Sequence, residues 1–152
     1  MIYLGSDHGG FELKQAIKDF LNKNNYEFKD LGCYSEESCD YPDYAIKVAT
    51  NVASEQGSLG ILICGTGIGM CMTANKVKGI RAALCHDEYT AKMSRAHNDA
   101  NVLCMGGRVL NKEEAIKIVK VWLETPFSEE ERHKRRISKI ASCLLYTSDA
   151  AD

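Results

Sequence analysis

The fold of this chain is decided by Gly60-Ile-Leu-Ile-Cys-Gly-Thr-Gly-Ile-Gly69, an apolar run that ends at a cysteine and breaks into a glycine-rich turn. A buried strand followed by Gly-x-Gly-x-Gly is how α/β proteins present backbone N–H groups to an anion. Cys64 stands at the break, where a strand gives way to a loop and then to a helix. A thiol in that place is exposed at the edge of a sheet and close to a helix N-terminus, which favours the thiolate. The stretch therefore predicts an anion-binding turn beside a reactive cysteine.

Strand-like and helix-like segments alternate on both sides of this stretch. Apolar strand patterns cover residues 2–6, 26–31, 59–64, 80–85 and 102–105. Apolar residues at helical spacing cover residues 11–24, 43–54, 70–76, 88–96, 112–123 and 128–142. This alternation predicts a three-layer α/β/α Rossmann-like fold with a five-stranded parallel sheet and helices on both faces.

The domain boundaries follow from composition and periodicity. The chain has 152 residues of ordinary globular composition. Residues 1–142 are predicted to form one domain with a sizeable core. Ser128 and Glu131 match a Ser-x-x-Glu capping box, which predicts that the last helix begins at Ser128. Residues 143–152 show no periodicity, and we expect a non-native or disordered tail, appended by cloning or read-through.

Composition and charge argue against several classes of function. The net charge of −2 gives no basic field for nucleic acid. No apolar run is long enough to span a membrane, and the first residues lack the features of a signal peptide. The seven cysteines are odd in number and form no Cys-x-x-Cys pair, which argues against a disulfide framework, a zinc site or a thiol redox protein. We expect a cytoplasmic protein with reduced thiols.

Several polar or glycine-containing segments stand at the ends of the predicted strands. They are Asp7-His8, Cys64-Gly65-Thr66, His86-Asp87 and Gly106-Gly107-Arg108. In open α/β sheets, ligands bind outside the carboxyl ends of the strands. Because all four segments share this location, together they predict a binding site more strongly than any one motif does.

Five motifs occur along the chain in an informative order: Ser6-Asp7-His8-Gly9-Gly10, Asp40-Tyr41-Pro42, Ile63-Cys64-Gly65-Thr66-Gly67-Ile68-Gly69, Arg95-Ala96-His97-Asn98-Asp99 and Gly106-Gly107-Arg108. In this order the chain resembles the ribose-5-phosphate isomerase B family, whose wider group includes galactose-6-phosphate and allose-6-phosphate isomerases. The resemblance runs from Met1 to about Ile140. The cysteine–glycine loop and the His-Asn-Asp motif together are specific, whereas Gly-x-Gly-x-Gly alone would be weak.

The resemblance implies an aldose–ketose isomerase that interconverts D-ribose 5-phosphate and D-ribulose 5-phosphate. The reaction moves a proton between C1 and C2 through an enediolate, and it needs no metal or other cofactor if hydrogen-bond donors hold the enediolate. The resemblance implies Cys64 as the base for the C2 proton, His97 as the group that opens the sugar ring, and Thr66 as a donor to the enediolate oxygen. Backbone N–H groups of the turn would also hold that oxygen, from Gly65, Gly67, Ile68 and Gly69.

Four further residues are implied as contacts of the phosphorylated sugar. Asp7 and His8 would meet the sugar ring and the phosphate end, and Tyr41 and Asn98 would lie near the substrate. Three of them have a structural alternative. Asp7 could cap the helix that follows it, Asn98 could end a helix, and Tyr41 could be a packed residue before a proline. For Cys64 the alternative is a buried strand cysteine.

The phosphate contacts implied by the resemblance come from late in the chain. They are Arg108, Arg132 and Arg136, with His133 as a further contact. Arg132 and Arg136 are four residues apart, so they share a helix face and could close on one anion. The alternative for this charge run is a solvated basic face.

The predicted geometry places His97 far from Cys64 in one chain. The helix over residues 88–96 should start at the carboxyl edge of the sheet and run back by roughly 14 Å, at about 1.5 Å per residue. His97 would then act on a sugar bound at Cys64 only from a second subunit. We therefore expect a homodimer whose active site is shared between subunits, or a tetramer built from such dimers.

Two other functions stay open at this point. The same chemistry could act on galactose 6-phosphate or allose 6-phosphate, because the length of the pocket decides the substrate. A non-catalytic phosphosugar- or nucleotide-binding module could use the same glycine turn. Two features argue against a dinucleotide-binding site: the turn lacks Gly-x-Gly-x-x-Gly spacing, and it follows the third strand rather than the first.

Overall fold

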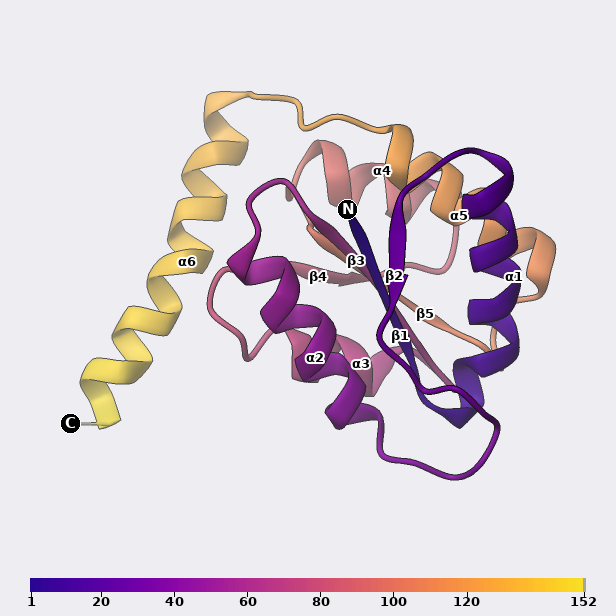
Figure 1. The fold of residues 1–152 in the computed structure, drawn as a ribbon. Coiled ribbons are helices and arrows are strands. Elements are labelled where there is room, and N and C mark those ends of the chain that lie inside the picture. The colour runs from indigo at the N-terminus through magenta and orange to yellow at the C-terminus, as the bar shows by residue number, and fades with distance from the viewer. Residues whose placement is uncertain (152) are drawn as a thin grey trace.

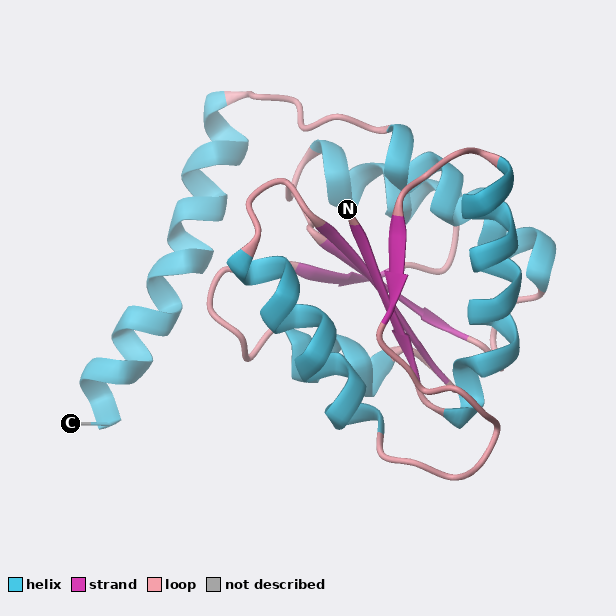
Figure 2. Ribbon diagram, in the orientation of Figure 1, coloured by secondary structure: helices cyan, strands magenta, loops and turns pink. Residues whose placement is uncertain are grey.

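A five-stranded parallel sheet forms the centre of the computed structural model, which describes the backbone of residues 1–151 and the side chains of residues 1–144. The strands are β1 (Ile2–Ser6), β2 (Phe28–Asp30), β3 (Leu59–Cys64), β4 (Ala82–Leu84) and β5 (Val102–Gly106). They lie in the order β2-β1-β3-β5-β4, and each neighbouring pair is parallel. Figure 2 shows the strands side by side between the helices. The predicted sheet is confirmed.

Helices cover both faces of this sheet (Figure 1). They are α1 (Phe11–Lys23), α2 (Tyr41–Ser54), α3 (Ile68–Ala74), α4 (Glu88–Ala96) and α5 (Lys112–Glu124), with a short 3-10 turn, η1 (His8–Gly10), before α1. The last helix, α6 (Glu131–Ala151), stands to one side of the sheet (Figure 1). One core cluster joins α1, α4 and α5 to the sheet, and the other joins α2 and α3 to it. The predicted three-layer α/β/α Rossmann-like arrangement is therefore confirmed.

Strand β3 lies between β1 and β5, which explains why the stretch ending at Cys64 is apolar throughout. Successive side chains of a strand point to opposite faces. Ile61 and Ile63 belong to the core under α1 and α5, whereas Leu62 and Cys64 belong to the core under α2 and α3. Cys64 is thus the last residue of a fully covered strand, at the carboxyl edge of the sheet.

The last helix differs from its prediction at both ends. It begins at Glu131 and continues to Ala151, not from Ser128 to about residue 142. The predicted capping box is wrong, because Ser128 lies before the helix and its hydroxyl pairs with Nδ1 of His133 at 2.7 Å. A backbone helix continues through most of residues 143–152, while the side chains of 145–152 lie outside the described residues. A non-native origin of this segment stays a prediction.

Two other boundaries bear on the site. Helix α2 begins at Tyr41 rather than Asp43, with Pro42 in its first turn, where the missing N–H costs nothing. Helix α3 begins at Ile68 rather than Met70, so that Gly67 is its N-cap. Among the described residues, we find no helix with the length and apolar character needed to cross a membrane.

Candidate active site

The Cys64 sulfur lies against the first turn that follows it. The thiol is buried, not exposed as the sequence predicted, because it lies in the core under α2 and α3. Its sulfur accepts a hydrogen bond from the backbone N–H of Gly67 at 3.1 Å. This bond requires the chain to turn back sharply after β3. Gly67 makes the turn with a φ of 82°, in the left-handed region that glycine adopts at little cost. The sequence thus places a thiol and a backbone donor in direct contact.

The turn is closely packed, which fixes its N–H groups. A side chain at Gly67 would meet Leu84 and the backbone of Met105, and one at Gly106 would meet the backbone of Thr66. The Thr66 hydroxyl oxygen accepts from the N–H of Ile68 at 3.3 Å. Since a hydroxyl that accepts through its oxygen keeps its own hydrogen to donate, Thr66 can still serve as a donor to a bound oxygen.

Arg108 covers the same turn from β5. Its backbone N–H donates to the Gly65 carbonyl at 2.9 Å. One of its guanidinium nitrogens lies 3.1 Å from the point where a Cβ of Gly65 would be. The predicted phosphate-binding arginine is therefore in contact with the glycine turn.

Three more of the predicted residues lie at the carboxyl edge of the sheet. Oδ1 of Asp7 accepts from the N–H of Gly10 at 3.1 Å, so Asp7 does cap the helical turn η1, as its structural alternative foresaw. Nδ1 of His8 accepts from the N–H of Cys39 at 3.2 Å, which leaves the proton of a neutral His8 ring on Nε2. The ring of Tyr41 lies against Gly69, where a Cβ would overlap its ring carbons.

The structure thus gathers most of the predicted residues at the carboxyl edge of the sheet, and we call them the cysteine half-site. They are Asp7, His8, Tyr41, Cys64, Gly65, Thr66, Gly67, Ile68, Gly69 and Arg108.

The other predicted residues lie elsewhere, and we call them the histidine half-site: His97, Asn98, Arg132, His133 and Arg136. His97 ends α4, and its ring contacts that of His133 on α6, with 4.3 Å between centroids and a tilt of 31°. Arg132 pairs with Glu130 at 3.0 Å.

The two half-sites lie at opposite edges of the sheet. The segment that starts at His97 leads into Val102, the first residue of β5, whereas Cys64 pairs with Gly106, the last residue of β5. At about 3.3 Å per residue, the two ends of this strand are roughly 13 Å apart. A single chain therefore does not bring His97 to Cys64.

His133 is buried within the histidine half-site. Removal from water lowers the pKa of its ring, and so do the neighbouring His97, Arg132 and Arg136, while Glu130 acts in the opposite direction. The Ser128 hydroxyl pairs with its Nδ1. His133 is thus held as a neutral ring against His97 at neutral pH.

Sequence reasoning missed the residues that hold the segment after His97. Asp99 has a φ of 47°, which is uncommon outside glycine. Nε of Arg81 donates to the Asp99 carbonyl at 2.8 Å, and its guanidinium also contacts the carboxylate at 3.3 Å. Arg95 lies 3.8 Å from the same carboxylate and stacks over Trp122 at 5.2 Å. The four-residue spacing of Arg95, at the end of α4, and Asp99, just after it, was the available signal for this pairing.

Comparison with known proteins shows the family of the chain. The Ribose/Galactose Isomerase family model matches residues 2–140. Ribose-5-phosphate isomerase B of Escherichia coli is 46% identical over 141 residues, which cover 93% of this chain and 94% of that protein.

Two solved structures are similar over nearly the whole chain. The Clostridium thermocellum ribose-5-phosphate isomerase B has a TM-score of 0.93 and 49% identity, with 96% of this chain and 98% of that chain covered. The Mycoplasma genitalium enzyme with bound ribulose-5-phosphate has a TM-score of 0.88 and 47% identity, with 92% and 93% covered. These matches confirm the resemblance to ribose-5-phosphate isomerase B, and the chain belongs to the ribose/galactose isomerase family.

Proposed function

We propose that this protein interconverts D-ribose 5-phosphate and D-ribulose 5-phosphate. The observation that carries the proposal is the contact between the Cys64 sulfur and the packed glycine turn, with Arg108 beside it. A base, fixed hydrogen-bond donors and a cation for the phosphate then lie together at the carboxyl edge of the sheet, as this isomerisation needs. The bound ribulose-5-phosphate of the Mycoplasma genitalium relative supports a pentose phosphate as substrate.

Cys64 is the base in this proposal. The thiolate takes the proton from C2 of the open-chain aldehyde, and the C–H electron pair forms the C1–C2 double bond while the carbonyl oxygen becomes an oxyanion. The Cys64 thiol then returns the proton to C1, and the proton of the C2 hydroxyl passes to the C1 oxyanion, which gives the ketose and restores the thiolate. Thr66 and the N–H groups of the turn are suited to hold the oxyanion, because close packing fixes them before charge develops.

The ring-opening group, His97, comes from a second subunit in this proposal. The position of His97 at the amino edge of the sheet supports this arrangement, because His97 and Cys64 of one chain lie too far apart to act on the same sugar. Arg132 and Arg136 flank His133, which contacts His97, so they would enter the shared site together with it. Arg108 would bind the phosphate of the substrate and would belong to the subunit that supplies Cys64.

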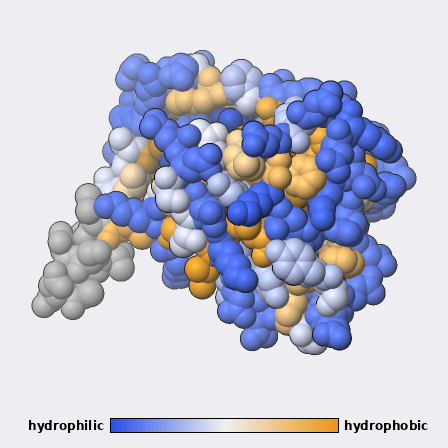
Figure 3. Space-filling view, viewed as in Figure 1, coloured by the Kyte–Doolittle hydropathy of each residue, from blue (hydrophilic) through white to orange (hydrophobic). Residues whose placement is uncertain are grey.

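The surface beside α6 supports assembly into such a dimer. A cleft of about 610 Å³ lies between α6 and the segment around β4, with Ile80, Ile137 and Ile140 in its lining. Strand β4 is an edge strand, and unpaired edges are usually covered. Figure 3 shows apolar surface between α6 and the rest of the molecule. A second copy would cover this surface, and a tetramer would need a further interface.

The test compares initial rates on ribose 5-phosphate, allose 6-phosphate and galactose 6-phosphate under identical conditions. The proposal expects the highest kcat/KM on ribose 5-phosphate. Much faster turnover of a hexose phosphate would overturn the pentose assignment and keep the chemistry. Binding of all three without turnover would instead favour a phosphosugar-binding module.

A further inference from the structure

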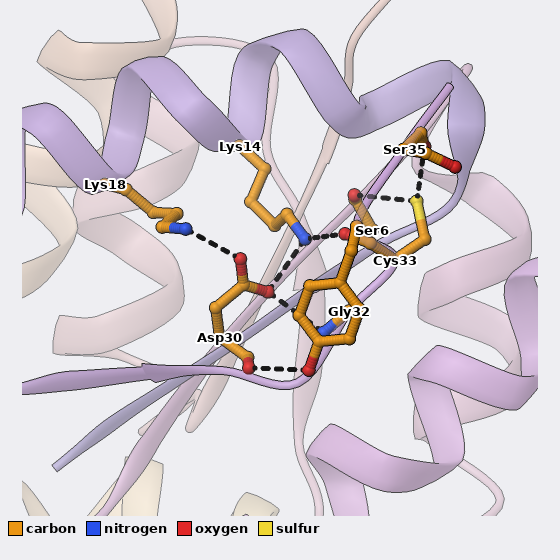
Figure 4. A network of polar contacts seen from close by, with 8 residues as sticks. Ser6, Lys14, Lys18, Asp30, Gly32, Cys33 and Ser35 are labelled. Carbon is orange, nitrogen blue, oxygen red and sulfur yellow. Dashed lines mark hydrogen bonds and ion pairs between the residues drawn. The ribbon is translucent and has the colours of Figure 1, made fainter. Parts of the chain in front are cut away.

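Lys14 of α1 is buried completely, which is rare for a lysine. Its ammonium donates to Oδ1 of Asp30 at 2.8 Å and to the carbonyl oxygen of Cys33. The rings of Phe11 and Tyr34 lie 5.7 Å and 5.6 Å from it, close enough for cation–π attraction. A buried ammonium is costly unless it is paired and hydrogen-bonded, and here both hydrogen-bond acceptors, Asp30 and Cys33, belong to one short segment (Figure 4).

Asp30, the last residue of β2, is the other charged centre of this network. Its carboxylate accepts from Lys14, from Lys18 at 2.9 Å and from the backbone N–H of Gly32 at 2.9 Å. Burial alone would raise the pKa of the Asp30 carboxyl, but the hydrogen bonds from the two lysines lower it below its usual value. The carboxylate therefore stays charged and ties α1 to the segment that follows β2.

That segment is paired with the end of β1. The carbonyl of Gly32 accepts from the N–H of Ser6 at 2.8 Å, and the N–H of Cys33 donates to the carbonyl of Ser6 at 2.8 Å. Ser6 is followed by Asp7 and His8 of the cysteine half-site. Lys14 therefore fixes the backbone on which these two residues are presented.

The same segment leads into the other side of the half-site. Residues 34–40 pass along the carboxyl edge of the sheet to the start of α2 (Figure 1). Near the end of this loop, the N–H of Cys39 donates to His8. Tyr41 follows and lies against Gly69. The far end of the loop that Lys14 anchors thus contacts His8 and leads into Tyr41, two predicted substrate contacts.

A contribution to folding stability does not by itself explain why a lysine is buried at this position. Replacing a buried ion pair by apolar residues of similar volume is often neutral or stabilising. What an apolar residue could not do is hold the Cys33 carbonyl and the Asp30 carboxylate at fixed positions. The network is therefore better explained by the geometry that it imposes on residues 30–41.

We propose that Lys14 is a positioning residue for substrate binding: its ammonium fixes residues 30–33 and, through them, His8 and Tyr41, without touching the sugar. This inference rests on the proposed isomerase function. In this role Lys14, in the first turn of α1, sets the affinity for substrate, whereas the Cys64 thiol performs the proton transfer.

The test is Lys14→Met, which keeps most of the volume and removes the ammonium. We expect KM for ribose 5-phosphate to rise about tenfold while kcat changes by less than about threefold, because the displaced contacts bind substrate rather than move the proton. Lys18→Met is the matched control. It removes the other lysine that pairs with the Asp30 carboxylate and leaves the contact to the Cys33 carbonyl in place. KM should stay within about twofold of the wild-type value.

A double variant separates positioning from folding. Lys14→Met with Asp30→Asn removes both partners of the buried pair, so Tm should recover while KM stays high. A wild-type KM in folded Lys14→Met, or recovery of KM together with Tm in the double variant, would overturn the positioning role. Should Lys14→Met not fold, the double variant gives the KM that decides. A wild-type protein without turnover would instead refute the proposed isomerase function.

Discussion

The backbone N–H of Gly67 donates a hydrogen bond to the sulfur of Cys64 at 3.1 Å. The two residues are three apart, and the contact exists because the chain reverses directly after the buried strand β3. A thiol at the end of a buried strand, with an N–H donor fixed against it, leaves little freedom for either group. The reacting atoms of a substrate would contact both groups at once. Substitution of Cys64 and substitution of Gly67 therefore test the pair independently.

Removal of the thiol tests the base. Cys64→Ala should lower kcat on ribose 5-phosphate by about 10²–10⁴-fold, the usual contribution of a general base, while ribose 5-phosphate still binds. Steady-state kinetics and calorimetric binding measure the two effects. Cys104→Ala, a buried thiol on the neighbouring strand, is the control and should retain turnover. A Cys64→Ala enzyme with near-normal kcat would show that another group is the base.

Substitution of Gly67 tests the turn. Gly67→Ala places a methyl group against Leu84 and Met105 at a positive φ, so we expect a loss of about 2–4 kcal/mol in the free energy of unfolding and a large loss of kcat. Gly57→Ala is the matched control, because Gly57 has a similar φ of 86° and open space around it. It should cost about 1 kcal/mol, from backbone strain alone. Equal losses in urea unfolding would mean that packing of the turn is unimportant.

Acid titration tests the charged network of Asp30. Its pKa is lower in the folded protein than in the unfolded chain, so the carboxylate contributes stability above about pH 3.9, the unfolded value, and loses it as the pH falls through the folded value. Asp30→Asn should cost roughly 3–5 kcal/mol at pH 7, since it leaves Lys14 buried without its anion. The difference from wild type should shrink below about pH 4.

Asp19→Asn provides the control for this titration. It removes the same charge from an exposed position on α1 and should change stability by less than about 0.5 kcal/mol at any pH. A difference between wild type and Asp30→Asn that stays constant down to pH 2.5 would contradict the assigned pKa direction.

The sequence predicts the sheet and the cysteine half-site well for a physical reason. Each buried parallel strand is an apolar run closed by glycine or aspartate, so the strand ends, and with them Asp7, Cys64 and Arg108, can be placed from local pattern. The bounds of α4 follow equally from its helical period and its Asp87 cap.

The contacts that hold the two half-sites in place were not predictable in this way. Lys14 meets Cys33 across nineteen residues, and Arg81 meets Asp99 across eighteen. No period links such pairs, because they depend on how separate elements pack. The start of α6 was missed because the Ser128 hydroxyl pairs with a histidine five residues on, a competing partner that a capping pattern cannot reveal.

Mixing two inactive variants tests whether the half-sites of different subunits combine. Cys64→Ala and His97→Ala should each be inactive alone, since each homodimer would lack one group in both sites. In a mixed dimer one site carries both substitutions and the other carries neither. Random exchange at equal amounts should therefore restore about a quarter of wild-type activity, given that half of the dimers are mixed and each has one intact site. A mixture of Cys64→Ala with Cys64→Ser is the control and should stay inactive. If differently tagged subunits co-purify as mixed dimers and yet no activity returns, then His97 does not act across the interface, and its place at the amino edge of the sheet reflects only the end of α4.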